Sequence, residues 1–394
     1  MRYVPRRLES IVREAHRQFP AVVLTGPRRS GKTRLLRHLF PKARYFLMEE
    51  PDLVERFRAD PRGFLEAIEG PVILDEVQNV PEVFAYVRAR IDRAPRRAGR
   101  WLLTGSQEAP LMRHVTESMA GRAAILQLLP LSAAESPRVG LLRGGYPEVL
   151  ARPAAARLWF SSYLQTYLER DVRAILAVRD LSTFRRFLGL LASRHGQILN
   201  KSDLAAPLGV SVPTVGHWLD VLEATAQILL VPSYFENFGK RLVKSPRLYV
   251  ADPGLACHLL GIESESELLR SPFVGPLFEG LIASEIAKAQ VNAGRRRELY
   301  HFRDQQGLEV DFVVPAPGGG LRLIECKAGR TVVPAMAAPL RRLAETIAQN
   351  GARRPTVTMT VVHQPAKTDD AGTALAPGVQ ALSWRSFVES LNRR

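Results

Sequence analysis

Cysteine is scarce in this chain of 394 residues, which contains Cys257 and Cys326 and no other. Neither stands at metal-ligand spacing, so the sequence excludes a zinc cluster and a framework of structural disulfides. Long apolar runs are also missing, since no stretch approaches about 18 uninterrupted apolar residues. The basic N-terminus is followed by no apolar segment. We therefore expect a cytoplasmic protein with neither a signal peptide nor a membrane span.

Acidic residues are too few to balance the basic ones. The chain has 39 Asp and Glu against 55 Lys and Arg, a formal net charge of +16. This excess favours a polyanion partner, above all nucleic acid, because bound cations release condensed counterions from the phosphate backbone. Since nearly all of the cations are arginine, the alternative is that the excess reflects genomic base composition.

The most informative stretch is Ala21–Thr33, which reads AVVLTGPRRSGKT. Its second half fits G-x-x-x-x-G-K-[ST], in which backbone N–H groups surround phosphate oxygens, the lysine reaches the β- and γ-phosphates and the last hydroxyl holds Mg²⁺. A chance glycine turn is disfavoured, because an apolar strand precedes the motif and a helix, 34–40, follows it. We predict that ATP contacts Gly26, Pro27, Arg28, Arg29, Ser30, Gly31, Lys32 and Thr33.

Strands and helices alternate through the first 135 residues, as a parallel α/β sheet requires. Further buried strands are predicted at 44–48, 71–74, 100–104 and 124–129. The apolar run 72–74 ends in Asp75 and Glu76, the arrangement in which an aspartate holds the Mg²⁺ shell and the adjacent glutamate acts as general base. An exposed Asp-Glu turn is the alternative, and its place some forty residues after the phosphate loop disfavours it.

Three more polar residues follow in the same domain. Thr104 and Ser106 come at the end of a strand, and we predict that one of them is a polar sensor that positions water near the γ-phosphate. Arg122 precedes the last strand. It either stabilises transition-state charge on a neighbouring subunit's nucleotide or forms a surface salt bridge, and the sequence leaves both open.

The order GPRRSGKT, ILDEVQ, LLTGS, GR and LPLS resembles prokaryotic AAA+-related ATPases of the archaeal-ATPase type. Residues 142–150 and 162–175 are similar to the uncharacterised domain that usually follows that core. The resemblance implies a catalytic-glutamate ATPase with an additional strand. It also implies a homo-oligomer, for which a hexamer is one form, and no agreed substrate.

The middle of the chain is expected to be helical. Residues 158–176 have helical spacing and are predicted to form a lid over the nucleotide, with Arg170 or Arg173 as phosphate sensors, unless these charges only pair along a solvated helix face. Two helices joined at Gly209 then fit a helix-turn-helix.

The helix-turn-helix is extended by strands at 228–234 and 247–250, which read as a wing with basic residues between them. The expected DNA-contacting residues are Thr214, His217, Trp218, Lys240, Arg241 and Lys244. Because the second helix offers no arginine, we expect contacts to the DNA backbone more than base reading. Protein contact is the alternative, since many winged helices in ATPases have that role.

The last part combines an acidic helix start with two apolar strands that carry Asp311 and then Glu325-Cys326-Lys327. Strand alternation places Glu325 and Lys327 on one face. This pattern resembles restriction-like nucleases of the PD-(D/E)XK fold. The resemblance implies that Glu279, Asp311 and Glu325 ligate Mg²⁺ and that Lys327 stabilises or activates the attacking water. Residues 315–320 read as a hairpin turn, and 365–378 as a flexible loop before a final helix.

The predicted fold class is α/β, in four parts: a parallel-sheet P-loop ATPase domain (1–135), a helical lid (136–180), a winged helix-turn-helix (181–262) and an α/β restriction-nuclease-like domain (263–394). The leading functional hypothesis is an ATPase that acts on or is regulated by DNA. The alternatives are a nucleotide-dependent switch in defence or toxin–antitoxin control and an ATP-regulated Mg²⁺-dependent nuclease.

Overall fold

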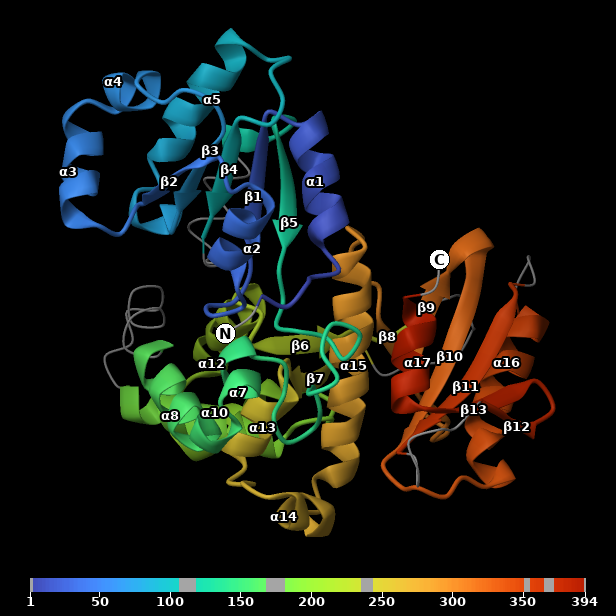
Figure 1. Ribbon diagram of the computed structural model, residues 1–394. Coiled ribbons are helices and arrows are strands. Elements are labelled where there is room, and N and C mark those ends of the chain that lie inside the picture. Colours follow the sequence, from blue (N-terminus) through green and yellow to red (C-terminus); the bar gives the residue numbers. More distant parts are fainter. Residues whose placement is uncertain are drawn as a thin grey trace.

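The computed structural model describes residues 3–105, 118–167, 181–234, 244–350, 355–364 and 372–392. Five of the predicted site residues lie outside these ranges: Ser106, Arg170, Arg173, Lys240 and Arg241. Figure 1 shows three regions, an N-terminal lobe built on one sheet, a largely helical middle region beneath it and a second sheet at the C-terminal end. Among the described residues, no helix is both long and apolar enough to cross a membrane.

The N-terminal lobe is a parallel sheet between two layers of helices. Its five strands stand in the order β2-β3-β4-β1-β5. They span Ala21–Thr25 (β1), Arg44–Leu47 (β2), Val72–Asp75 (β3), Trp101–Thr104 (β4) and Ala123–Gln127 (β5). The helices span Glu9–Gln18 (α1), Lys32–Leu39 (α2), Pro51–Ala59 (α3), Pro61–Glu66 (α4) and Val83–Arg93 (α5).

Side-chain alternation along the strands explains the two helical layers. Val22 and Leu24 of β1 pack with α1 and α2, whereas Ala21 and Val23 pack with α3, α4 and α5. Because both faces are covered, the central strands are apolar at successive positions, and every residue of β1, β3 and β4 is buried.

The prediction that all of these strands are buried is wrong for two of them. β2 and β5 are the edges of the sheet, and both are half-buried, with Arg44 exposed and Ile125 45% exposed. Short apolar runs indicate a strand but carry no information about its place in the sheet, which depends on pairing between distant segments.

The middle region packs its helices around one hydrophobic core. The helices span Pro147–Ala151 (α7), Ala156–Tyr167 (α8), Leu181–Ser193 (α10), Lys201–Ala205 (α11), Val212–Ala224 (α12), Pro253–Leu259 (α13) and Glu265–Arg270 (α14). An antiparallel pair, Ile228–Val231 (β6) and Arg247–Val250 (β7), completes it. Phe160 and Tyr163 of α8 share this core with Phe187 of α10, so the segments predicted separately as lid and helix-turn-helix pack as one unit.

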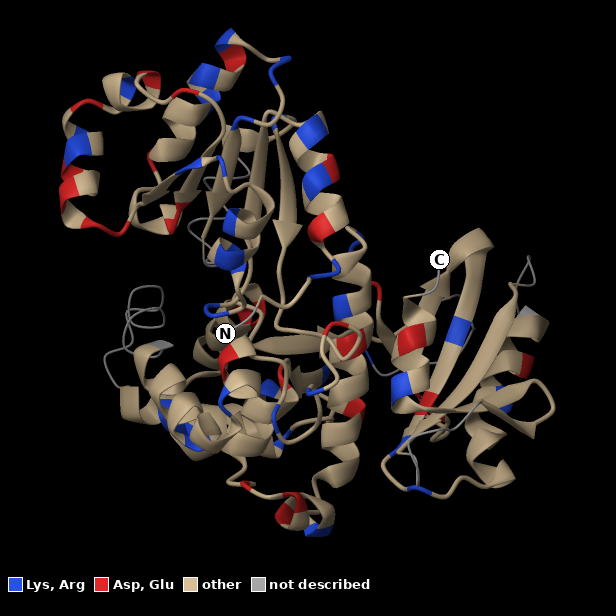
Figure 2. Cartoon of the chain, in the orientation of Figure 1, with Lys and Arg blue, Asp and Glu red and all other residues tan. Residues whose placement is uncertain are grey.

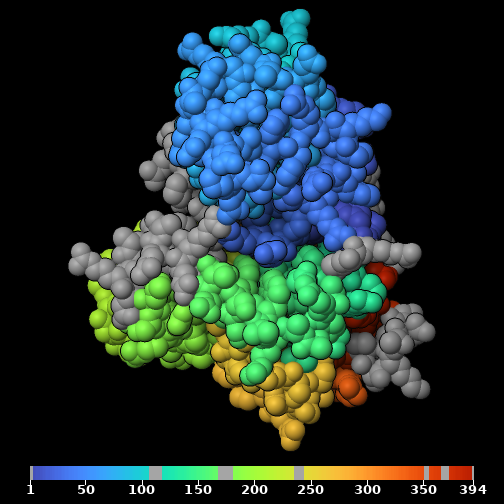
Figure 3. Space-filling view, turned by 60° about the vertical axis from the view of Figure 1, so that its left-hand side comes forward, coloured from blue at the N-terminus to red at the C-terminus, as the bar shows by residue number. Residues whose placement is uncertain are grey.

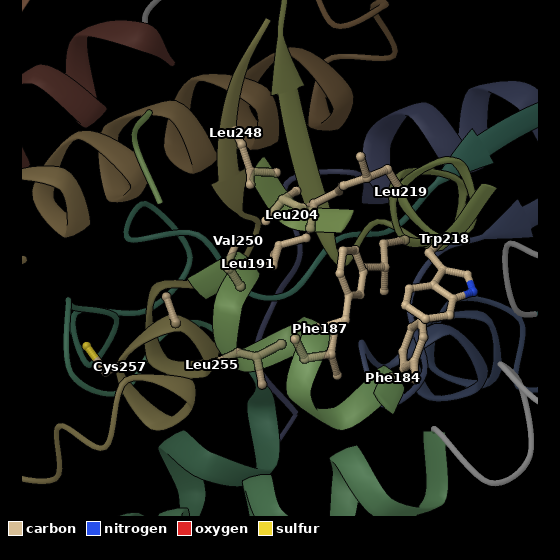
Figure 4. Packing of buried hydrophobic residues seen from close by; sticks show 14 of the residues in the cluster. Phe184, Phe187, Leu191, Leu204, Trp218, Leu219, Leu248, Val250, Leu255 and Cys257 are labelled. Atoms are coloured by element: carbon tan, nitrogen blue, oxygen red, sulfur yellow. The ribbon is translucent and has the colours of Figure 1, made fainter. Parts of the chain in front are cut away.

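The helix pair predicted around Gly209 is present. α11 continues into a single 3-10 turn, Ala206–Leu208, and Gly209 then takes a φ of 65° before α12 begins. Its assigned contact residues differ in exposure: His217 is exposed and Thr214 half-buried, but Trp218 is buried against Phe184 and Phe187 (Figure 4). The assignment of Trp218 to DNA contact is therefore wrong, because its helical position faces the core.

The C-terminal region is a mixed sheet with helices on both faces. The order of its six strands is β12-β13-β11-β10-β9-β8. They span Tyr300–Arg303 (β8), Glu309–Ala316 (β9), Gly320–Lys327 (β10), Val357–His363 (β11), Thr373–Ala376 (β12) and Val379–Ser383 (β13). The helices are Val274–Asn292 (α15) and Trp384–Leu391 (α17) on one face and Ala338–Asn350 (α16) on the other.

Two predictions about this region have different outcomes. The turn predicted at 315–320 lies between β9 and β10, where Pro317–Gly319 forms a 3-10 turn. The loop predicted for 365–378 is wrong at its end, because Thr373–Ala376 pairs antiparallel with β13. This strand is a short edge strand with an irregular register, so its sequence shows little of the alternation by which strands are recognised.

Helix α15 lies between the middle region and the C-terminal sheet (Figure 1). It packs against Tyr249 of β7 on one side and Phe312 and Ile324 of the sheet on the other. Contact on both sides explains why the helix is buried along nearly all of its second half, including Glu285 and Lys288. The helix therefore belongs as much to the middle region as to the domain whose start it was predicted to mark.

The middle core gives a stability prediction. Phe187 is fully buried, so Phe187→Ala should reduce the free energy of unfolding by about 3 to 5 kcal/mol through lost apolar contact and a residual cavity. Leu158→Ala is the control, because Leu158 is 72% exposed and should change it by less than about 0.5 kcal/mol. Urea titration followed by circular dichroism measures both. Equal losses in the two variants would contradict the packing described here.

Candidate functional site

The first candidate site is the loop between β1 and α2, residues 26–31. Gly26 has a φ of 138°, and a Cβ at that position would lie 2.2 Å from the carbonyl oxygen of Leu128. Only glycine fits there, because the loop passes directly against the chain that leaves β5. Arg29 and Gly31 also have positive φ, 62° and 99°, so the loop curls tightly before α2 begins at Lys32.

The loop is arranged to receive an anion. The Lys32 ammonium donates to the carbonyl oxygens of Gly26 and Pro27, each at 3.0 Å, and so lies beneath the loop. The Ser30 hydroxyl is buried and has no hydrogen-bond partner among the described residues. An unpaired buried donor at a helix N-terminus is what a phosphate oxygen would satisfy.

Asp75 is the centre of the site. Its side chain is buried, and the Thr33 and Tyr45 hydroxyls each donate to Oδ2 at 2.8 Å. The Thr104 hydroxyl donates to Oδ1. The carboxyl ends of parallel strands meet at one edge of the sheet, so β2, β3 and β4 and the start of α2 bring these groups together. Thr104 thus contacts the predicted Mg²⁺ ligand, which is compatible with its predicted place near the γ-phosphate.

Tyr45 was not predicted. Burial and its hydrogen bond to Asp75 raise the pKa of the Tyr45 phenol well above its ordinary value, so the hydroxyl stays a donor. Tyr45 lies near Asp75 because β2 stands beside β3 in the sheet. The sequence does not show strand order, and an aromatic residue in a strand is too common to indicate a site.

Glu76 follows Asp75 in an unusual backbone conformation. Its φ is 56°, a left-handed value that costs about 1 kcal/mol or more for a residue with a side chain. The carboxylate accepts a hydrogen bond from the Gln78 amide and is half-buried. This turn directs Glu76 away from the strand's ordinary alternation and into the same cleft as Asp75.

A cleft of about 910 Å³ separates the phosphate loop from the middle region. Figure 3 shows the N-terminal lobe, in blue, resting on the green segment that contains α7 and α8. The loop side of the cleft contributes Lys32, Thr33, Asp75 and Glu76, and the facing side contributes residues of α7 and α8. The described part of the predicted lid therefore lies opposite the phosphate loop.

Two groups on the facing side were not predicted. Arg152 lines the cleft and is held by Glu148, with 2.7 Å between Arg152 Nε and Glu148 Oε1. Trp159 also lines the cleft, and its ring stacks on Tyr163 with the centroids 5.1 Å apart and the planes at 10°.

Arg6 braces the loop from behind and was also missed. Its buried guanidinium donates to the carbonyl oxygens of Ser30 at 2.9 Å and Leu129 at 2.6 Å, and pairs with Glu135 at 3.1 Å. The N-terminal segment, the phosphate loop and the chain after β5 are thereby joined by one side chain. The sequence does not indicate this role, because Arg6 is far along the chain from all three of its partners.

Arg122 forms a surface salt bridge, one of the two roles that the sequence left open. It pairs with Asp92 through two hydrogen bonds of 2.6 and 3.1 Å on the exposed surface. It immediately precedes β5, whose first residue is in register with Ala21, so it lies at the end of the sheet opposite the phosphate loop. Contact with a neighbouring subunit's nucleotide stays a prediction.

The second candidate site is the carboxylate cluster of the C-terminal region. Glu279 of α15, Asp311 of β9 and Glu325 of β10 do lie together, as predicted, with Lys327 Nζ 2.7 Å from Glu325 Oε1. Burial, together with the neighbouring Asp311 charge, raises the pKa of Glu279 to about 8 and that of Glu325 to about 7. The pKa of Lys327 is raised as well: burial opposes the charge, but Glu325 outweighs it.

Arg247 enters this cluster from β7 and was not predicted. Its Nη1 lies 3.3 Å from Asp311 and 3.5 Å from Glu279, and Nη2 pairs with Glu309. In the described part of the chain, no three His, Cys, Asp or Glu side chains are arranged to hold a metal ion. Glu279 and Asp311 therefore come together as predicted, but around a guanidinium, whereas Glu325 pairs with Lys327.

The five-stranded parallel sheet, the phosphate loop and the Asp75–Glu76 pair give the N-terminal lobe the fold of an AAA-type P-loop ATPase. An AAA domain family matches residues 18–136, and two families described as domains of unknown function, DUF8612 and DUF4143, match 135–266 and 274–376. The chain is 34% identical over 315 residues to the uncharacterized protein Rv2008c of Mycobacterium tuberculosis, covering 78% of this chain and 70% of that protein. Mb2031c of Mycobacterium bovis matches equally. The chain belongs to the family of these mycobacterial proteins.

The similarity to solved structures is weaker. The Walker-type ATPase PABY2304 of Pyrococcus abyssi is 17% identical, with a TM-score of 0.42 over 64% of this chain and 94% of that one. AMPPCP-bound DnaA from Aquifex aeolicus is 11% identical, with a TM-score of 0.29 over 55% of this chain and 85% of that one.

The role of Arg6 gives a prediction. Arg6→Met should cost about 3 kcal/mol of stability, because it leaves the buried Glu135 without its cation, and should weaken ATP binding by loosening the loop at Ser30. Arg7→Met is the control, since Arg7 is exposed. Thermal unfolding and titration with a fluorescent ATP analogue measure the two effects. Unchanged affinity in a destabilised Arg6 variant would contradict the bracing role.

Proposed function

We propose that this protein hydrolyses ATP with Mg²⁺ and that its nucleotide state is coupled to contact with DNA. ATP hydrolysis with Mg²⁺ is supported by the 2.8 Å hydrogen bond between the Thr33 hydroxyl and Asp75 on the loop side of the cleft. A hydroxyl and a carboxylate at this separation are two oxygen ligands of the kind Mg²⁺ prefers, so the residues present fit the ion. Bound there, Mg²⁺ would neutralise charge on the phosphate oxygens.

The chain's own residues account for the remaining steps. Lys32 would exchange the Gly26 and Pro27 carbonyls for phosphate oxygens, and the backbone N–H groups of the loop would orient the phosphates. Glu76 would accept a proton from water as the water oxygen bonds to the γ-phosphorus and the bond to the β–γ bridging oxygen breaks. ADP and phosphate are the products. Thr104 positions Asp75 and does not itself take up a proton.

Glu76→Gln tests this assignment. It should lower kcat for ATP about 100-fold or more with ATP affinity retained, because it removes the proton acceptor and leaves the phosphate contacts in place. Glu49→Gln is the matched control, since Glu49 lines the same cleft without adjoining Asp75. Steady-state phosphate release and nucleotide titration separate the two quantities. Equal kcat values in the two variants would remove Glu76 from its role.

Contact with DNA is supported by the net charge of +16 and by the helix pair α11 and α12. Figure 2 shows Lys and Arg in every region of the chain, interspersed with Asp and Glu. Near the helix pair, Lys201 and Lys244 are both exposed. Such cations favour contact with phosphates and not with base edges.

Reversal of these two charges tests the DNA proposal. Lys201→Glu combined with Lys244→Glu should weaken DNA binding about equally for unrelated sequences and make the affinity less dependent on salt. Lys42→Glu is the control, an exposed lysine of the N-terminal lobe. Fluorescence anisotropy at several salt concentrations, with single-stranded, duplex and branched DNA, gives the result. Equal affinity of the double variant and the control would contradict DNA contact at this helix pair.

A second candidate function is a nucleotide-dependent switch, in defence or toxin–antitoxin control, that senses a protein partner. The observation that favours it is the composition of α12, which contains no lysine or arginine and exposes His217 and Asp220. A recognition helix without cations suits a protein surface better than a phosphate backbone. ATP turnover that is slow and indifferent to all three DNA forms would favour this candidate.

A further inference from the structure

The carboxylate cluster of the C-terminal region holds a cation supplied by another part of the chain. Arg247 belongs to β7 of the middle region, whereas Glu279 lies on α15 and Glu309 and Asp311 on β9. The Arg247 side chain is 6% exposed and that of Asp311 10% exposed, so the interaction takes place largely away from water. A buried arginine needs carboxylate partners to offset its lost hydration, and here it has three.

The geometry follows from strand alternation on both sides. Arg247 and Tyr249 are two residues apart on β7 and point the same way, and both reach Oε2 of Glu279, at 3.5 and 3.3 Å. Glu309 and Asp311 are two apart on β9 and face Arg247 together. A single nitrogen, Nη1, thus lies between Glu279 and Asp311, where a metal ion shared by these two carboxylates would lie.

Two further acceptors of the predicted metal set are occupied, whereas Glu325 Oε2 is buried without a hydrogen-bond partner among the described residues. Asp311 Oδ2 accepts a hydrogen bond of 2.8 Å from the backbone N–H of Cys326, and Glu325 Oε1 accepts from Lys327. Mg²⁺ needs about six oxygen ligands at about 2.0 to 2.1 Å in near-octahedral order. A guanidinium in that position excludes such a shell by its volume and repels a dication by its charge. The residues present therefore do not fit the metal.

We propose that Arg247 is the resident cation of this cluster, in place of the metal ion that the carboxylate pattern predicts, and that the cluster is an ionic clamp between β7 and the C-terminal sheet. The clamp is independent of the ATPase assignment, because none of its residues lines the nucleotide cleft.

The test is Mn²⁺ binding, measured by electron paramagnetic resonance on full-length, chelator-treated protein without nucleotide. Wild type and the Asp311→Asn variant should bind the same amount of Mn²⁺, because the wild-type cluster should hold no Mn²⁺ ion. Arg247→Met should gain one Mn²⁺ site, because it leaves the carboxylates without their cation, and the double variant with Asp311→Asn should lose it again. Arg247→Lys, which keeps the charge, should resemble wild type.

Two results would overturn the proposal. One is a Mn²⁺ site in wild type that is lost in Asp311→Asn. This comparison does not need the Arg247→Met variant, so it still tests the proposal if that variant does not fold. The other is a folded Arg247→Met variant that gains no Mn²⁺ site. A plasmid-nicking assay with Mn²⁺ is the second readout: wild type should match the Lys327→Ala variant, whereas nicking that Lys327→Ala abolishes would also overturn the clamp.

Discussion

The nucleotide site depends on one buried carboxylate. Asp75 accepts hydrogen bonds from Thr33, Tyr45 and Thr104, which come from three different elements. A charge in this position is tolerated only if it is paired or hydrogen-bonded, so the neighbouring strands and α2 must stay in register for the lobe to be stable. The same oxygens suit a metal ion, and hydroxyl donors can rotate to admit one. Stability without nucleotide and readiness to bind it thus rest on the same group of atoms.

The phosphate loop is physically joined to the rest of the molecule through the chain that leaves β5. Arg6 connects Ser30 of the loop to Leu129 and Glu135. The same segment is held from the other side by α15, where Glu285 accepts from the Ala133 N–H and Lys288 donates to the Leu131 carbonyl. Glu285 and Lys288 also pair at 3.0 Å. A displacement of the loop would therefore strain contacts that reach the helix shared by the two other regions.

Short sequence patterns predicted the features that depend on residues close together in the chain. The phosphate loop, the strands that end at Asp75 and Thr104 and the helix pair around Gly209 follow from short-range periodicity and glycine placement, and the structure has them where expected. Tyr45, Arg6 and Arg247 could not be found in this way, because each acts on partners brought close only by strand order or by packing between regions. Burial is likewise a property of the assembled fold. The sequence therefore predicts wrongly that β2 and β5 are buried and that Trp218 is a contact residue.

In the C-terminal cluster, the sequence motif predicts which side chains lie together but not the chemistry that they perform. Spacing along two strands and a helix start places Glu279, Asp311, Glu325 and Lys327 together, but it does not determine which cation neutralises them. Arg247 lies outside that region, on a strand whose Leu248 and Val250 pack in the core shared with α8. A metal ion could enter only if the Arg247 side chain left Asp311 and Glu279, and Tyr249 would still hold Glu279 in place. The chemistry of the cluster is therefore decided by the packing of the middle region and not by the acidic residues themselves.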